Sequence, residues 1–342
     1  MKERFSKALK IVAFILCAAI LFSFISNVCE RKTFDGPWNY MAKLNEFYSL
    51  EDDTLDYVGV GSSHMYCTLN PLEVWNNSGA AGFVLATQQQ PLTASYHYIK
   101  ETFKTQSPKY VILEGYMICV EETTDSAVLY DAIDPLRPSF NKFQMINNLV
   151  PYERRPDYYF NILKYHTRWS SISLDQVNNI LGEHIDTYKG FVALQGDFKG
   201  ENLIPDYEST QDIQLSQYNL NILNKIYELT QAHNAELILM LGPYNAQSPD
   251  LAQKIKAEIN WAKEKKVAVL DYSELLNTIE INPECDYYDP GHLDVSGAAK
   301  VSAHFAEYLL DKGVTANTSI NTEKWQADYD SYVENFSSEL NK

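Results

Sequence analysis

Short apolar strands alternate with helical patterns over most of this chain, and that alternation restricts the fold more than any other feature. Strand character appears at residues 56–61, 82–87, 109–114, 235–241 and 267–271. Helical patterns cover residues 70–77, 91–105, 215–233, 251–266 and 295–312. Because strands that alternate with helices form parallel sheets covered on both faces, the sequence predicts an α/β fold of three layers, α/β/α, around a five-stranded parallel sheet. We expect the three strands before residue 117 and the two strands after residue 214 to share this sheet, since either group alone would leave edges and faces bare.

Two segments do not follow the alternation. Residues 117–214 are rich in Tyr, Asn, Pro and Arg and show no regular exchange of strands and helices. Loops at the carboxyl edge of a parallel sheet commonly shape ligand sites, so we expect this insertion to cap that edge. Residues 314–342 form a polar extension with four aromatic side chains, which is either a docked helix or a frayed tail. We therefore predict an N-terminal segment at 1–32 and one domain at 33–313.

The amino terminus carries an uncharged apolar run from Ile11 to Val28. As a helix, this run is about 27 Å long, close to the hydrocarbon thickness of a bilayer. Four basic residues precede it, which places the N-terminus in the cytoplasm and the rest of the chain outside. A cleaved signal peptide is the rival interpretation, but its apolar core is usually shorter and ends in a clearer cleavage site. A retained transmembrane signal anchor is therefore our preferred prediction.

Charge and cysteine content exclude several classes of function. The formal net charge is −17, and because the first 32 residues carry six basic and two acidic residues, the remainder carries −21. A body this acidic repels phosphate backbones, so we expect no nucleic-acid partner. The five cysteines have no CxxC spacing, so the sequence predicts neither a zinc site nor a disulfide framework.

The first strand ends in a turn that places a serine where a ligand could bind. The sequence there is Val58-Gly59-Val60-Gly61-Ser62-Ser63-His64. In a doubly wound sheet the carboxyl end of this strand faces the ligand crevice, and glycine lets the chain turn sharply. Ser63 is therefore a candidate nucleophile. Capping of the next helix is the simpler role for both serines.

A second stretch, just before the last helix, supplies the groups that a serine nucleophile needs. It reads Asp286-Tyr287-Tyr288-Asp289-Pro290-Gly291-His292-Leu293-Asp294. A serine hydroxyl requires a base to take its proton, and the imidazole requires a carboxylate to orient it. His292 is the candidate base and Asp289 the candidate acid, with Asp286 and Asp294 as alternatives to Asp289. The competing interpretation is a capping or buried histidine beside an Asp-Pro-Gly turn.

Taken together, these two stretches resemble the SGNH, or GDSL-type, superfamily of hydrolases and acyltransferases. The resemblance covers about residues 55–313 apart from the insertion. It implies a flavodoxin-like strand order, Ser63 as nucleophile, His292 as base and Asp289 as orienting acid. The anchor and the Gly-Ser-Ser-His form look most like the envelope-acylating branch, which includes the teichoic-acid D-alanyl transfer protein and the alginate O-acetylation proteins.

That branch implies a location and a substrate class. We expect a membrane-anchored domain outside the cytoplasm, on a bacterial cell surface. It would act as a serine acyl-esterase or O-acyltransferase on a cell-envelope polysaccharide or teichoic-acid-type polymer, through an acyl-serine intermediate. A multi-spanning membrane acyltransferase is the expected partner, and no cofactor is expected.

One departure from the superfamily concerns the oxyanion hole. The usual Asn after the third strand is absent, because Gly115-Tyr116-Met117 stands in its place. Loss of one oxyanion donor typically costs about 10²–10³ in rate. We expect the donors to be the Ser63 backbone N–H and a side chain of the Gln88-Gln89-Gln90 run after the second strand, with Gln90 preferred. A solvated loop is the simpler interpretation of this run, and Asn245 is a second candidate donor.

Three further side chains are candidates for the site. His64 is either a wall of the site or, in a rival triad, the base. His166 and Trp169 in the insertion are candidates for substrate contact, because an aromatic face can stack on a sugar ring. Packing of Trp169 into the core is the simpler alternative.

Two other functions compete with the serine enzyme. If no oxyanion donor exists, the protein is a non-catalytic scaffold or polymer-binding protein. A metal-dependent enzyme using His64, Asp289 and His292 is a third hypothesis, for which the ligand spacing gives no support.

Overall fold

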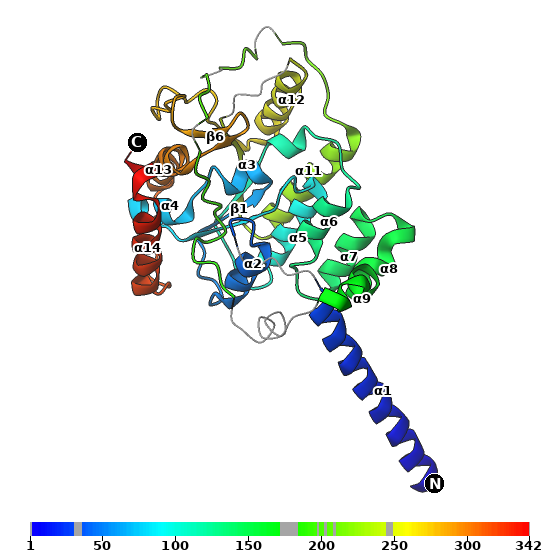
Figure 1. The fold of residues 1–342 in the computed structure, drawn as a ribbon. Coiled ribbons are helices and arrows are strands. Elements are labelled where there is room, and N and C mark those ends of the chain that lie inside the picture. The colour runs from blue at the N-terminus through cyan, green and yellow to red at the C-terminus, as the bar shows by residue number, and fades with distance from the viewer. Residues whose placement is uncertain are drawn as a thin grey trace.

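A five-stranded parallel sheet forms the centre of the protein (Figure 1). The computed structural model describes residues 2–30, 36–171, 184–196, 198–201, 204–207, 210–243 and 249–341. The strand order is β2-β1-β3-β4-β5. The strands span Tyr57–Gly61 (β1), Gly82–Ala86 (β2), Tyr110–Glu114 (β3), Glu236–Leu241 (β4) and Ala268–Asp271 (β5). Each lies within one residue of its predicted position at both ends, so the expected mixed α/β fold with both groups of strands in one sheet is confirmed.

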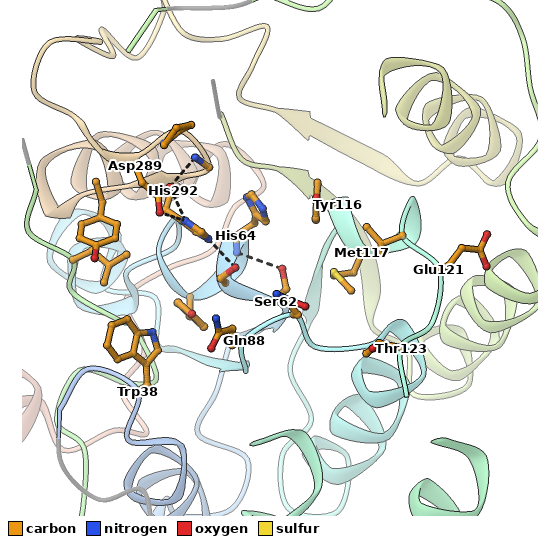
Figure 2. A pocket seen from close by; sticks show the side chains of 18 residues that line it. Trp38, Ser62, His64, Gln88, Tyr116, Met117, Glu121, Thr123, Asp289 and His292 are labelled. Carbon is orange, nitrogen blue, oxygen red and sulfur yellow. Dashed lines mark hydrogen bonds and ion pairs between the residues drawn. The ribbon is translucent and has the colours of Figure 1, made fainter. Parts of the chain in front are cut away.

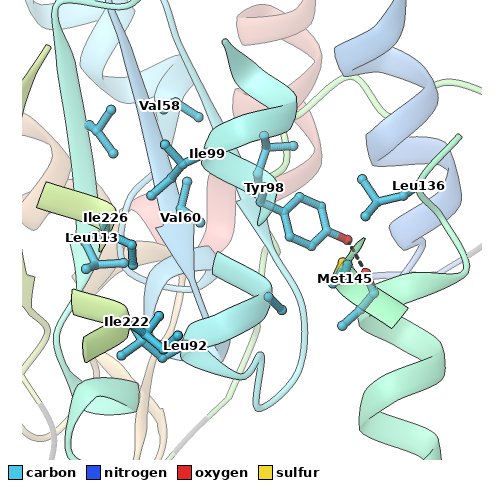
Figure 3. Close-up of a cluster of buried hydrophobic side chains, with 14 of the residues drawn as sticks. Val58, Val60, Leu92, Tyr98, Ile99, Leu113, Leu136, Met145, Ile222 and Ile226 are labelled. Atoms are coloured by element: carbon cyan, nitrogen blue, oxygen red, sulfur yellow. Dashed lines mark hydrogen bonds between the residues drawn. The ribbon is translucent and has the colours of Figure 1, made fainter. Parts of the chain in front are cut away.

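Side chains alternate between the two faces of the sheet, as a period of two requires. On one face, Val58 and Val60 of β1 share a buried cluster with Tyr98 and Ile226 (Figure 3). That cluster brings in α5 (Leu92–Thr102), α7 (Phe140–Leu149) and α11 (Gln217–Ala232). On the other face, Tyr57 packs with residues of α3 (Ser63–Tyr66), α4 (Pro71–Ser78) and α13 (Val295–Asp311). Apolar burial therefore stabilises both faces.

The part of the segment between β3 and β4 that extends to residue 171 is mostly helical. It contains the short helices η1 (Tyr116–Ile118), α6 (Ser126–Ile133), η2 (Tyr152–Arg154), α8 (Arg155–Tyr159), α9 (Asn161–Tyr165) and η3 (His166–Ser171), together with α7. Helix α7 packs on α5, and α8 and α9 lie beside it. Described parts of this segment that reach the carboxyl edge of the sheet include residues 117–123, Leu194 and Tyr207, whose hydroxyl donates to Asp271 at the end of β5 at 2.8 Å. Part of the insertion therefore lies at the edge where a cap is expected.

An N-terminal helix, α1 (Lys2–Cys29), projects from the body (Figure 1). Its residues Arg4–Cys29 are long and apolar enough to cross a membrane. The apolar side chains in this stretch are exposed, so α1 is not a core helix.

Helix α14 (Thr322–Leu340) shows that the C-terminal extension is docked. Trp325 and Tyr332 are buried against the body. The Lys189 ammonium lies 2.5 Å from Asp328 of α14 and 2.6 Å from Glu46 of α2 (Tyr40–Ser49). All three side chains are buried, so this ion-paired cluster ties both ends of the domain to the segment that carries Lys189.

Candidate active site

The turn after β1 gives its two serines different roles. Ser62 is the N-cap of α3. The backbone N–H of Ser62 donates to the Glu114 carboxylate at 3.1 Å, and the Ser62 hydroxyl donates to the same carboxylate at 2.9 Å. Burial raises the pKa of Glu114. A Cβ on Gly61 would lie 2.3 Å from the Glu114 Cβ, so glycine is required for β1 and β3 to approach here. Ser62 is thus structural, and Ser63 begins the helix.

Ser63, His292 and Asp289 form one hydrogen-bonded chain (Figure 2). The Ser63 Oγ lies 2.8 Å from His292 Nε2, and His292 Nδ1 lies 2.8 Å from Asp289 Oδ1 and 3.0 Å from Oδ2. The histidine and aspartate come from a short antiparallel hairpin, β6 (Tyr287–Asp289) and β7 (His292–Leu293). The Gly291 N–H donates to Asp289 Oδ1 at 2.7 Å and fixes the carboxylate.

The neighbouring acids have other partners. Asp294 caps α13, since its Oδ1 accepts from the backbone N–H groups of Ser296 and Gly297. Asp286 pairs with Lys300 at 2.6 Å. Of the three acids considered from the sequence, only Asp289 touches His292.

Ser63, His292 and Asp289, which we call the triad, line a cavity of about 660 Å³ at the carboxyl edge of the sheet (Figure 2). Such an edge is where α/β sheets bind ligands. The walls combine aromatic, polar and aliphatic side chains. They include Trp38, Tyr66, Gln88, Gln89, Tyr116, Met117, Glu121 and Tyr288.

His64 forms a wall of this cavity. Its ring stacks on His292 with centroids 5.1 Å apart and lies 4.4 Å from the Tyr116 ring. Burial, with a contribution from His292, lowers the pKa of His64 to about 3. His64 is therefore neutral at ordinary pH, and the base within reach of Ser63 is His292.

The expected oxyanion donor Gln90 is not at the site, and that prediction is wrong. Gln90 is fully buried, and its Nε2 donates to Ser95 Oγ at 3.1 Å. The exposed side chains of Gln88 and Gln89 line the cavity instead, with Gln88 between Trp38 and Ser62 in Figure 2. The three glutamines are consecutive in sequence, and only the bend of the chain after β2 decides which of them face the cavity. Asn245 lies outside the described residues.

The Ser63 backbone N–H is available as a donor. Within the described part of the chain, no group accepts a hydrogen bond from it. It belongs to the first residue of α3, the same residue whose Oγ lies 2.8 Å from His292. A negative oxygen formed on a carbon bound to that Oγ would lie near this N–H.

The structure places His166 and Trp169 away from the cavity, so their expected role in substrate contact is wrong. Both are exposed on η3, which contacts α1 and α9. The alternative of a Trp169 packed in the core is also wrong, because 72% of this residue is exposed. The tryptophan at the cavity is Trp38, for which the sequence offered no signal.

His64, Asp289 and His292 are better described as a hydrogen-bonded chain with a stacked neighbour than as metal ligands. Over the ranges that the structure describes, no group of three or more His, Cys, Asp or Glu side chains could hold a metal ion.

No protein-family model matches this chain, and a search of curated proteins finds no match either. The case for a function therefore depends on the geometry of the site.

Proposed function

We propose that this protein is an SGNH-like serine acyl-esterase or O-acyltransferase. The observation that carries the proposal is the chain from Ser63 Oγ through the His292 ring to the Asp289 carboxylate, with both links at 2.8 Å, at an open cavity. This is the arrangement by which a base and an orienting acid activate a serine.

The residues suggest each step of the reaction. His292 Nε2 takes the hydroxyl proton as Ser63 Oγ attacks the ester carbon, and Asp289 stabilises the imidazolium that forms. The Ser63 N–H donates to the oxyanion, and Gln88 is placed to supply a side-chain donor. His292 then protonates the leaving alcohol, which leaves an acyl-Ser63. Water or a sugar hydroxyl, deprotonated by His292, releases the acyl group as acid or ester.

Three features support the SGNH-like assignment. The order β2-β1-β3-β4-β5 is the flavodoxin-like order, and helices pack against both faces of the sheet, as in a three-layer fold. The serine follows the first strand, and Asp289 and His292 immediately precede α13. One departure is that Met117 occupies the position where the superfamily has its Asn.

The same proposal includes location and substrate. A basic flank before an apolar α1 is typical of an anchor that leaves the following domain outside the cytoplasm. An open cavity with Trp38 and Tyr288 on its walls suits a sugar polymer, since aromatic rings stack on sugar faces. We therefore propose an envelope polysaccharide or teichoic-acid-type polymer as acceptor or substrate, and a multi-spanning membrane acyltransferase as a partner that supplies acyl groups.

Substitution of the nucleophile tests the proposal. Ser63→Ala should abolish hydrolysis of p-nitrophenyl acetate by the full-length protein and leave its circular dichroism unchanged. Ser62→Ala is the matched control, because Ser62 donates to Glu114 and does not contact His292. Hydrolysis that persists undiminished in the Ser63→Ala protein contradicts the assignment.

A non-catalytic polymer-binding scaffold is the second candidate. The observation that favours it is the loss of two side-chain donors, since Met117 replaces the superfamily's Asn and Gln90 points into the core. A fluorophosphonate probe separates the two functions. Labelling of Ser63 supports the enzyme, and a folded protein that resists labelling supports the scaffold.

A further inference from the structure

The last turns of α1 are joined to the body by specific contacts. The Phe22 ring packs edge-on against Phe160, with centroids 6.3 Å apart. The backbone N–H of Ile162 donates to Ser26 Oγ at 3.0 Å, and Arg168 Nη1 donates to the Cys29 carbonyl at 3.2 Å. Helix α9 and η3 thus hold the end of the apolar helix.

An exposed aromatic surface surrounds this junction. Phe143 stacks on Phe140 at 6.3 Å and on Tyr159 at 5.4 Å, and Tyr159 precedes Phe160 in the chain. We call the set the aromatic face; its exposed fractions are Phe140 73%, Phe143 50%, Tyr159 37%, Phe160 52%, Leu163 49% and Trp169 72%. A group of exposed apolar side chains of this kind is typical of an interaction site.

A cavity of about 480 Å³ lies between α1 and the helices that carry the aromatic face. Phe22, Phe143, Ile146 and Phe160 are among its apolar walls, and polar side chains that include Glu30, Asp134 and Lys142 line the rest. The Lys142 ammonium donates to the backbone carbonyls of Asp134 and Leu136, so its charge is directed into the protein. An apolar chain would find its favourable surface on the aromatic walls.

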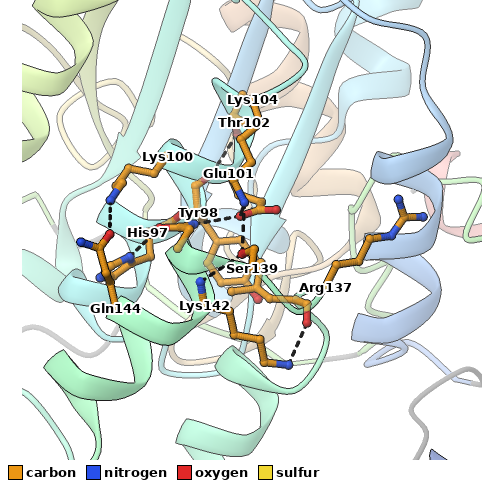
Figure 4. Close-up of polar contacts among 12 residues, drawn as sticks. His97, Tyr98, Lys100, Glu101, Thr102, Lys104, Arg137, Ser139, Lys142 and Gln144 are labelled. Carbon is orange, nitrogen blue, oxygen red and sulfur yellow. Dashed lines mark hydrogen bonds and ion pairs between the residues drawn. The ribbon is translucent and has the colours of Figure 1, made fainter. Parts of the chain in front are cut away.

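The aromatic face is held rigidly to the sheet by polar contacts between α5 and α7 (Figure 4). His97 Nδ1 lies 2.7 Å from Asn141 Oδ1, and the Asn141 amide donates to the Glu101 carboxylate at 2.8 Å. Lys100 of α5 donates to Gln144 of α7 at 2.7 Å. Burial lowers the pKa of His97 to about 4, so it remains a neutral hydrogen-bonding group.

The depth of the aromatic face relative to the apolar helix follows from the Phe22–Phe160 contact. The apolar run ends at Val28, six residues after Phe22, and at 1.5 Å per residue this distance is about 9 Å. Phe160 therefore lies level with helix residues that are inside the apolar stretch. Side chains of interfacial proteins enter a bilayer by about 5–10 Å, to the boundary of headgroups and acyl chains.

We propose that the aromatic face is a membrane-docking surface, which lies at the boundary of headgroups and acyl chains in the leaflet on the body's side of α1, with a lipid acyl chain in the cavity beside α1. Aromatic residues concentrate at this level next to membrane helices, because their rings are apolar and their edges tolerate water. The docking surface depends on α1 crossing the bilayer and does not depend on the esterase proposal. The occupant is bilayer lipid, since the face continues directly from the membrane helix.

Quenching by brominated lipid tests this docking in the full-length protein. The chain has five tryptophans, and of these only Trp169 lies on the aromatic face. In vesicles of dibrominated phosphatidylcholine, Trp169→Phe should remove the lipid-quenched part of the emission, which is about one fifth if the five tryptophans emit equally and only Trp169 meets lipid. Trp38→Phe is the control, because Trp38 is partly exposed at the other cavity.

A second pair of variants places a new probe in the Trp169→Phe background. Phe143→Trp should restore quenching, whereas Leu310→Trp, at an exposed apolar position on α13, should not. The proposal is overturned if Trp169→Phe leaves the quenching unchanged, if the Phe143 and Leu310 probes are quenched equally, or if the protein fails to float with the vesicles. Esterase activity of the same samples reports separately on the proposed function.

Discussion

Removal of the charge on Asp289 tests the catalytic role proposed for the triad most directly. In Asp289→Asn, the side-chain oxygen can keep the Gly291 N–H at 2.7 Å and His292 Nδ1 at 2.8 Å, so the imidazole should retain its orientation. What is lost is the attraction between the carboxylate and the imidazolium. For two charges 2.8 Å apart this attraction is about 6 kcal/mol at an effective dielectric constant of ~20.

Solvent reduces that energy, because 39% of the Asp289 side chain is exposed. With about half of the attraction screened, roughly 3 kcal/mol remains, which corresponds to a fall of about 10² in kcat. The expected loss is smaller than the ~10⁴ known for a serine protease whose buried triad aspartate becomes asparagine with a change of tautomer.

The measurement is kcat for p-nitrophenyl acetate across pH 5–9, with the Ser63→Ala protein as the inactive reference. Asp294→Asn is the isosteric control, since asparagine also caps helices and Asp294 does not contact His292. It should stay within about threefold of the wild type. The reasoning fails if Asp289→Asn keeps more than a third of the activity, or if it is as inactive as Ser63→Ala.

Two further predictions concern stability. Gly61→Ala should lower the unfolding free energy by about 1–3 kcal/mol in urea titrations, because the new methyl group would meet the Glu114 side chain; an unchanged midpoint would mean that β1 and β3 can separate without cost. Burial raises the pKa of Glu46 to about 7, and the opposing effect of its ion pair with Lys189 is smaller than the effect of burial. The folded state then binds more protons than the unfolded state between pH 4.5 and 7, so stability should fall as pH rises through this window, by at most about 3 kcal/mol. Glu46→Gln should flatten this dependence in thermal unfolding, and a slope equal to that of the wild type would contradict it.

Local pattern was sufficient to locate the sheet. Each strand is a short apolar run between turn residues, and all five were placed within one residue at both ends. Helices with a clear apolar period, such as α11 and α13, were also located within two residues. The helices α6 to α9 were missed because they are short and partly exposed, so their apolar residues have no helical period over a sufficient length.

The site was predictable only where one loop supplied the geometry. Asp289 and His292 lie three residues apart across a Pro-Gly turn, so their contact is local. The sequence could not show whether Gln88 or Gln90 faces the cavity. The orientation of each side chain depends on the bend of the backbone, where Gln89 has a φ of +49°. Trp38 reaches the cavity through the fold of the whole domain, and no spacing in the sequence encodes that contact.

The position of α1 relative to the Ser63 turn bears on how the protein would meet its substrate. Contacts run without a break from α1 through α9 and α8 to α7, from α7 to α5, and from α5 to β1, which ends at the serine turn. In Figure 1, α1 leaves the body beside α9 and points away from α3, which carries Ser63, and from β6, which carries Asp289. If α1 spans the membrane, these rigid links hold Ser63 at a fixed height on the part of the body turned away from the bilayer. A polymer that extends outward from the membrane could reach such a site, whereas an acyl ester buried in the leaflet could not. Esterase activity on soluble oligosaccharide esters that exceeds activity on lipid-embedded esters is therefore the expected pattern, and the reverse preference would refute this placement of the site.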